Sequence, residues 1–154
     1  MTTIRVLSFA YGRALAPTAD LTIDLRALLR NPAADPELRQ LTGLDQPVYD
    51  YVMNTPGAEW LAVHAVATAR GLARESGADV TIAWGCTSGQ HRSVSLARAS
   101  YDLLHAAGDR ATITHLDVHE PPAPRTDPGP EDGGDLLLVD LDGGRGGPLP
   151  DNPR

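Results

Sequence analysis

The chain has 154 residues, of which 42% are hydrophobic, so we expect one domain with a core rather than a disordered chain. Its single cysteine excludes an internal disulfide, and with no bilayer-length apolar run or secretory leader we expect a cytoplasmic location. All thirteen basic residues are arginine, and a net charge of -7 without a basic stripe argues against tight nucleic-acid binding.

The amino-terminal part predicts two strands, a long loop and a short helix. Residues 4–10 and 21–26 alternate and are rich in β-formers, so each range predicts a strand. Residues 27–44 contain two prolines and a glycine and predict a loop, and loops of that length are usually functional. Asp45 is a predicted N-cap for a helix ending near Asn54.

Helices and strands alternate through the rest of the predicted domain. We expect a helix over 58–76, a strand over 79–84, a helix over 92–107 and a strand over 111–118. This order predicts a single-domain α/β fold with a mostly parallel, four-stranded sheet flanked by helices. In the first of these helices the apolar residues that recur at helical spacing are Trp60, Leu61, Val63, Val66, Ala69, Leu72 and Ala73. In the second, the residues expected to face the core are Val94, Leu96, Ala97, Tyr101, Leu103 and Leu104.

The composition changes after Val118. Residues 1–118 hold ten Arg and twelve Asp or Glu, whereas residues 119–154 hold three Arg and eight Asp or Glu. We therefore predict a ligand-binding domain over 1–118 and a largely disordered Pro/Gly/Asp-rich tail over 119–154. Residues 135–141 are an apolar island in this tail, expected either to add an edge strand or to dock on the domain.

The most informative segment is residues 85–93, Gly-Cys-Thr-Ser-Gly-Gln-His-Arg-Ser, which we call the glycine loop. It follows the third predicted strand and precedes a helix, so its backbone N–H groups lie at the positive end of that helix and form an anion site. His91 and Arg92 add side-chain donors, and the planar fork of arginine suits phosphate. The predicted ligand is a phosphorylated or otherwise anionic small molecule.

Other polar residues are predicted to join this loop, because ligands of parallel α/β sheets bind at the carboxyl ends of strands. Asp24 and Arg26 share one face of a strand end, where a simple ion pair is the alternative to ligand contact. No metal or cofactor is predicted, because the Cys and His spacings do not match a zinc site. The predicted ligand-binding residues are Ser8, Asp24, Arg26, Gly85, Cys86, Thr87, Ser88, Gly89, Gln90, His91, Arg92 and Ser93.

The loop also matches a catalytic signature. Cys86, Gly89, Arg92 and Ser93 have the C-x-x-G-x-x-R-[ST] spacing of cysteine-dependent phosphatases, in which a thiolate at a helix N-terminus attacks phosphorus. Gly85 stands where those enzymes usually have His, and no Trp-Pro-Asp-like general-acid loop is visible. We therefore favour a passive anion cradle over a phosphatase with Cys86 and Arg92 as catalytic residues, and a purely structural turn is the third alternative.

Several collinear motifs over about residues 4–118 resemble the RapZ carboxyl-terminal domain family. The glycine loop resembles that family's GCTGG-x-HRS loop, and Ser8-Phe9 resembles its opening SFG. Residues 24–32 resemble its D-x-R and N-P motifs, and residues 35–48 resemble its DPELR-x-LTGLD-x-PV motif.

The resemblance implies a domain of a bacterial RNase adapter that senses glucosamine-6-phosphate and binds small regulatory RNAs and an endoribonuclease. It implies ligand contacts from the glycine loop, at Cys86, Thr87, Gly89, His91 and Arg92, with Asp24 and Arg26 as neighbours. Family members often carry the name nucleotide-binding protein, but this chain resembles only their carboxyl-terminal half, so we do not infer ATP binding through their kinase-like domain.

The chain departs from the family at three places. Ser88 and Ala10 replace glycines, and an acidic tail replaces a basic one, which weakens the case for RNA. The expected partner is a phosphorylated small molecule, with RNA, an RNase or a second copy of the chain as open alternatives and no membrane.

Overall fold

Four parallel strands form one sheet in the computed structural model, which describes residues 1–121. The strands are β1 (Ile4–Ala10), β2 (Leu21–Asp24), β3 (Val80–Cys86) and β4 (Ala111–His115), in the order β2-β3-β1-β4. All three strand pairings are parallel, so the prediction of a mostly parallel sheet is confirmed. The predicted extra strand at 135–141 lies outside the described residues, and the domain boundary at 118 stays a prediction.

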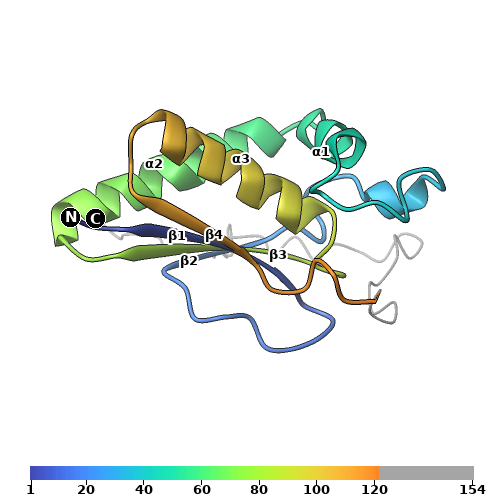
Figure 1. The fold of residues 1–154 in the computed structure, drawn as a ribbon, viewed down its shortest axis with the longest axis horizontal. Coiled ribbons are helices and arrows are strands. Elements are labelled where there is room, and N and C mark those ends of the chain that lie inside the picture. The colour runs from blue at the N-terminus through green and yellow to red at the C-terminus, as the bar shows by residue number, and fades with distance from the viewer. Residues whose placement is uncertain (122–154) are drawn as a thin grey trace, which may run out of the picture.

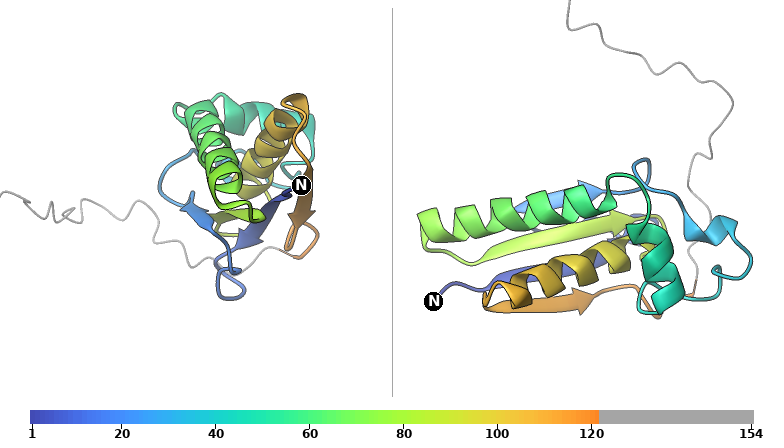
Figure 2. Two further views of the ribbon diagram at one scale, coloured as in Figure 1. Left: turned by 90° about the vertical axis from the view of Figure 1, so that its left-hand side faces the viewer. Right: turned by 90° about the horizontal axis from the view of Figure 1, so that it is seen from above.

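The helices lie on one side of the sheet (Figures 1 and 2). The long helices α2 (Ala58–Ser76) and α3 (Arg92–Ala106) run along this face, and α1 (Gln46–Met53) lies near the carboxyl ends of the strands. The predicted loop between β2 and α1 contains a short 3-10 helix, η1 (Pro32–Ala34). Among residues 1–121, no helix is long and apolar enough to span a bilayer.

Three strand ends near the glycine loop differ from the prediction. Strand β3 continues two residues further than expected, because Gly85 and Cys86 pair with Phe9 and Ala10 of β1. The glycine loop therefore begins within the sheet, and its irregular part is residues 87–91. The strands β2 and β4 end earlier than predicted, so Arg26 follows β2 rather than ending it.

The predicted N-cap of α1 is confirmed in its position but not in its hydrogen bonding. Asp45 is the N-cap residue by position, but its side chain caps no helical N–H group. Its carboxylate instead accepts a hydrogen bond from the backbone N–H of Thr42 over 2.8 Å. The side chain therefore closes the turn before the helix, an alternative that Asp takes readily because its short side chain can reach a neighbouring amide.

The apolar residues at helical spacing in α2 divide between the core, where Val66, Ala69 and Ala73 are buried, and the outer surface. Trp60, Val63 and Leu72 are 61%, 41% and 44% exposed, so they lie on the outer surface. The buried residues of this helix are small, namely Ala58, Ala62, Val66, Ala69 and Ala73. This apolar row has helical spacing of its own, and its small side chains let α2 pack closely on its neighbours.

In α3 the prediction holds for the aliphatic residues Val94, Leu96, Ala97 and Leu104, which are buried. Leu103 is 37% exposed and Tyr101 is only half-buried, so neither is a core residue. Ser100 is buried in place of Tyr101 and accepts a 3.1 Å hydrogen bond from the indole N–H of Trp84. The buried indole N–H of Trp84 thus has its hydrogen-bond acceptor in a small polar residue of α3.

Candidate functional site

The segments after β1 and β2 run beside the end of β3, one on each side of the glycine loop. The backbone N–H of Leu25 donates to the carbonyl of Gly85 over 2.8 Å. On the other side, Tyr11 donates to the carbonyl of Cys86 over 2.9 Å, and Gly12 donates to that of Thr87 over 3.2 Å. The predicted gathering of strand ends around the loop is confirmed for β1, β2 and β3.

The backbone of the glycine loop presents a row of N–H groups. The amides of residues 88–94 donate no hydrogen bond to any residue within 1–121, and the first bond into α3 runs from Ser95 to the carbonyl of His91 over 3.0 Å. Most of this segment is buried, including Gly89 and residues 91–94. Buried backbone N–H groups nearly always have partners, so seven consecutive amides at the start of a 15-residue helix form a donor set suited to an anion.

Gly89 shapes the loop because its backbone has a left-handed conformation, with φ at 70°. A Cβ atom at this position would lie 2.8 Å from the Cβ of Asp117 and 3.0 Å from the backbone N of Ala10. Both conditions exclude a larger side chain. The loop is thus held against the ends of β1 and β4.

The segment around Gly43 closes the opposite side of the loop. Its backbone N–H donates to the carbonyl of Gln90 over 2.7 Å, and a Cβ atom here would lie 2.6 Å from the carbonyl oxygen of His91. Arg98 on α3 donates from Nη1 to the carbonyl of Gly43 over 2.9 Å. Part of the long loop that was predicted to be functional is therefore a wall of the site.

Arg92 is only 3% exposed, and one of its nitrogens already has three partners. Its Nη1 donates to the carbonyls of Leu25, Arg26 and Leu29 over 3.1, 2.8 and 3.3 Å. The guanidinium thus holds the turn that follows β2, a structural role that its position in the loop motif did not reveal. A contact between Arg92 and a ligand stays a prediction.

Asp24 and Arg26 form the ion pair that was the structural alternative. Nε of Arg26 donates to both carboxylate oxygens of Asp24 over 3.0 Å, and Nη2 donates to Oδ2 over 2.7 Å. The guanidinium also lies over the ring of Tyr11, 4.1 Å from its centroid. The hydrogen bonds from Arg26 lower the pKa of Asp24, and the charge of Arg92 acts in the same direction against the effect of burial. The carboxylate is therefore ionised at neutral pH.

Three predicted site residues have buried side chains with protein partners. The sulfur of Cys86 lies 3.1 Å from the hydroxyl oxygen of Ser93, and the two residues are 1% and 0% exposed. The hydroxyl of Ser8 is 2.8 Å from Nδ1 of His115, a residue that the sequence did not single out as part of the site. These side chains line the inner side of the loop.

His91 is 4% exposed, and its Nε2 makes no hydrogen bond to a residue in the described part of the chain. Burial lowers the pKa of this imidazole, and the charge of Arg92 lowers it further. The backbone carbonyls of Leu41 and Arg39 act in the opposite direction but are outweighed. The ring is therefore neutral at pH 7 and keeps one buried nitrogen available to a ligand.

Gln90 of the glycine loop contacts the segment after β4, which the sequence did not assign to the site. Gln90 donates from Nε2 to the carbonyl of Glu120 over 2.6 Å, and the carboxylate of Asp117 accepts the backbone N–H of Ala10 over 2.7 Å. Ser88 is half-buried and Thr87 is buried. Within residues 1–121, no cluster of three His, Cys, Asp or Glu side chains is placed to hold a metal ion.

Comparisons with known proteins agree on one family. A family model described as the RapZ C-terminal domain matches residues 2–119. A nucleotide-binding protein of Bifidobacterium adolescentis is 44% identical over 115 residues, which cover 72% of this chain and 37% of the relative. A nucleotide-binding protein of Streptomyces coelicolor is 42% identical over 117 residues, which cover 73% of this chain and 39% of the relative. The chain thus spans less than half the length of these two relatives.

Proposed function

Because the chain belongs to the family of the RapZ C-terminal domain, we propose that it is a regulatory domain that binds a phosphorylated small molecule at the glycine loop. The observation that carries this proposal is the row of backbone amides over residues 88–94, which donate to no described residue. Amides at a helix start hold a phosphate group through several hydrogen bonds and the helix dipole. The neutral imidazole of His91 adds a side-chain group to this set.

The groups around the loop favour an amino-sugar phosphate over a nucleotide. Asp24 is an ionised carboxylate next to the loop. Its oxygens accept hydrogen bonds from Arg26, and their remaining lone pairs can accept from the ammonium group of an amino sugar. The resemblance to RapZ points to the same class, with glucosamine-6-phosphate as the first candidate. The relatives are called nucleotide-binding proteins, but this chain covers only 37% and 39% of them. A nucleotide is therefore the competing class of ligand.

Isothermal titration with glucosamine-6-phosphate, glucose-6-phosphate, inorganic phosphate and ATP tests the proposal. We expect glucosamine-6-phosphate to bind most tightly, and Asp24→Asn to weaken its binding about tenfold while changing glucose-6-phosphate binding little. Arg30→Ala is the matched control, because Arg30 is exposed in the same loop region. A failure of all four compounds to bind would overturn the proposal, and tighter binding of ATP would overturn the choice of ligand class.

A second measurement locates the phosphate. Titration of ¹⁵N-labelled protein with inorganic phosphate should shift the amide resonances of residues 88–94 before those elsewhere. Shifts confined to other parts of the chain would place the anion at another site and contradict the assignment to the glycine loop.

A cysteine-dependent phosphatase is the second candidate, favoured by the 3.1 Å contact between the sulfur of Cys86 and the hydroxyl of Ser93. Cys86 and Ser93 are the first and last residues of the phosphatase signature, so this contact joins the two ends of that motif. Against catalysis, Cys86 is 1% exposed. Phosphate release from an aryl phosphate that disappears in Cys86→Ser would support this activity, and no release between about pH 5 and 8 would exclude it.

RNA binding, implied by the resemblance, is the third candidate, and the net charge of -7 gives it no electrostatic support. A gel shift at low salt that weakens as salt rises would support an RNA-binding role. No shift at low salt would contradict it.

A further inference from the structure

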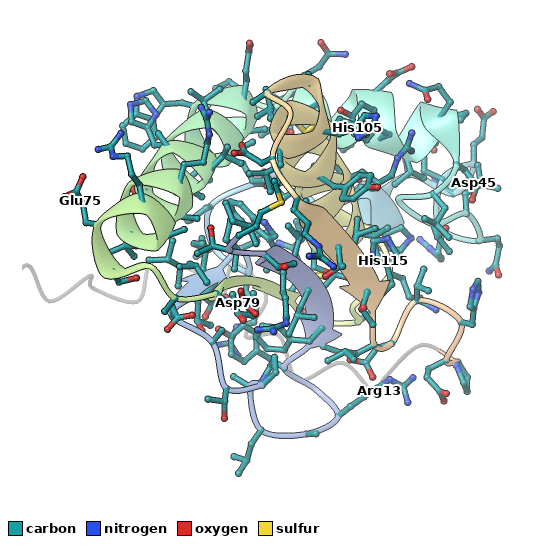
Figure 3. The ribbon with its side chains drawn as sticks, turned by 60° about the vertical axis from the view of Figure 1, so that its left-hand side comes forward. Arg13, Asp45, Glu75, Asp79, His105 and His115 are labelled. Carbon is teal, nitrogen blue, oxygen red and sulfur yellow. The ribbon has the colours of Figure 1, made fainter. Side chains whose placement is uncertain are left out.

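A cavity lies at the end of the sheet opposite the glycine loop. Its volume is about 530 Å³, and it is bounded by the amino end of β1, the second half of α2 and the turn between α3 and β4. Figure 3 shows Glu75, the penultimate residue of α2, on the opposite side of the view from Arg13 and Asp45, which belong to segments that contact the glycine loop. The cavity therefore has no part in the site described above.

The cavity combines an apolar floor with a basic rim. Ile4, Ala67 and Ala73 supply aliphatic surface, and three arginines, Arg70, Arg74 and Arg110, stand among the lining residues with a single acidic residue, Asp109. Glu75 bonds Arg74 and Asp79 interacts with Arg110, but neither carboxylate lines the cavity, so the lining itself holds three positive charges and one negative charge. Such a surface suits a ligand that carries both carboxylates and aliphatic groups.

The arginines retain donors for such a ligand. Nε of Arg70 lies 2.7 Å from Oδ2 of Asp109, and Nε of Arg74 donates to Glu75 over 2.8 Å. Both contacts use Nε, and no Nη group of these two arginines donates to a residue within 1–121. The side chains are 49% and 78% exposed, so a carboxylate can reach them.

We propose that this cavity is the docking site for the chain's own acidic and apolar segment, residues 131–142. This segment has the sequence Glu-Asp-Gly-Gly-Asp-Leu-Leu-Leu-Val-Asp-Leu-Asp, with five acidic residues and no arginine. Its four leucines and one valine match the apolar floor, and its carboxylates match the arginine rim. The segment includes residues 135–141, the apolar island for which the sequence predicted either an edge strand or docking on the domain.

The length of the connecting chain is compatible with this location. The described chain ends beside the glycine loop, where Gln90 holds the carbonyl of Glu120 over 2.6 Å. Residues 122–130 include four prolines, and a Pro-rich spacer of this length reaches about 28 Å at about 3.1 Å per residue. The seven-residue strands β1 and β3 are about 23 Å long at about 3.3 Å per residue, so the spacer reaches the opposite end of the sheet.

NMR on the full-length ¹⁵N-labelled chain tests this docking. In the wild-type chain we expect the amide resonances of residues 131–142 to differ from those of a synthetic peptide of the same sequence. The double variant Arg74→Glu/Arg110→Glu should move most of these resonances to the peptide positions, because it replaces two attractive charges by repulsive ones. Raising NaCl from about 0.05 to about 0.5 M should have the same effect, since exposed ion pairs are screened.

A matched control keeps the change in net charge equal. Arg30→Glu/Arg39→Glu carries the same two charge reversals on the side of the glycine loop and should leave the resonances of residues 131–142 in place. Release by this control instead would place the segment at the glycine loop and overturn the proposal. Coincidence of wild-type and peptide resonances would also overturn it.

A reciprocal variant avoids any change in the folded domain. Asp135→Asn/Asp140→Asn/Asp142→Asn should shift the amides of residues 67–74 and 109–110, which line the cavity. Shifts along β2 or β4 instead would indicate an added edge strand and would overturn docking in the cavity. None of these outcomes depends on the ligand of the glycine loop, so failure here leaves the proposed function untouched.

Discussion

Nη1 of Arg92 donates a 2.8 Å hydrogen bond to the backbone carbonyl of Arg26, so the first residue of α3 holds the turn that follows β2. The same nitrogen reaches two further carbonyls of this turn, and the guanidinium is buried. This turn also contains Arg26, which forms the ion pair with Asp24. Arg92, the arginine of the loop motif, therefore positions the turn that follows β2.

Arg92→Lys should lower the free energy of unfolding by about 2–4 kcal/mol, because a lysine keeps the buried charge but cannot reach the three carbonyls together. Urea denaturation followed by circular dichroism measures the change. Arg30→Lys at an exposed position is the control and should stay within about 0.5 kcal/mol of the wild type. A loss below about 0.5 kcal/mol in Arg92→Lys would show that the carbonyl contacts contribute little.

Gly89→Ala should destabilise the protein by about 1–3 kcal/mol, because alanine is strained at a φ of 70° and its Cβ would lie 2.8 Å from that of Asp117. Gly71→Ala is the matched control within α2, where an added Cβ meets nothing within 4 Å. That change should stabilise the protein by about 0.5–1 kcal/mol, since alanine is the better helix former. Thermal or urea unfolding of both variants measures the expected loss of stability in Gly89→Ala and the expected gain in Gly71→Ala.

Stability should fall as the pH decreases from 7 to 5. Burial is the largest cause that lowers the pKa of both His91 and His115 below the usual value of 6.5. The unfolded chain therefore takes up protons on these rings at a higher pH than the folded chain does, which favours unfolding in this window. Asp24 acts at lower pH, because its stabilising effect is lost only below its unfolded pKa of 3.8.

Urea unfolding at several pH values, together with NMR titration of the imidazole protons, measures this dependence. The double variant His91→Gln/His115→Gln should flatten the fall between pH 7 and 5. His64→Gln should keep the wild-type slope, because His64 is exposed. An unchanged slope in the double variant would mean that other groups cause the acid sensitivity.

Cys86 should resist alkylation by iodoacetamide in the folded protein, because the thiol is 1% exposed and lies against Ser93. The rate should rise steeply through the urea transition as the chain unfolds. Ser76→Cys in a Cys86→Ser background gives the rate of an exposed thiol on the same protein. Rapid modification of native Cys86 would show an accessible thiol and would strengthen the phosphatase candidate.

Much of the fold follows from local sequence signals. The apolar alternation of β1, the glycine that ends α2 and the glycine loop before α3 each lie within a few residues of the element they specify. Local conformational preference and hydrophobic spacing are therefore sufficient for these features. The same signals did not separate core from surface within α2, where Ala73 is buried but Trp60 is 61% exposed, because hydrophobicity alone does not show how closely a helix must pack.

The sequence by itself determined that an α/β chain carries a glycine loop between its third strand and a helix, because strand, turn and helix preferences are local. Only the tertiary structure decided which groups remain for a ligand. The hydroxyl of Ser8 meets His115 from 107 positions away, and Arg92 meets carbonyls 63 to 67 positions away. Such pairings depend on how β1, β2 and β4 are placed around β3, and no local pattern encodes them. The row of amides over residues 88–94 stands out as a site because these groups, like Nε2 of His91, donate to no residue within 1–121, whereas most neighbouring side chains have protein partners.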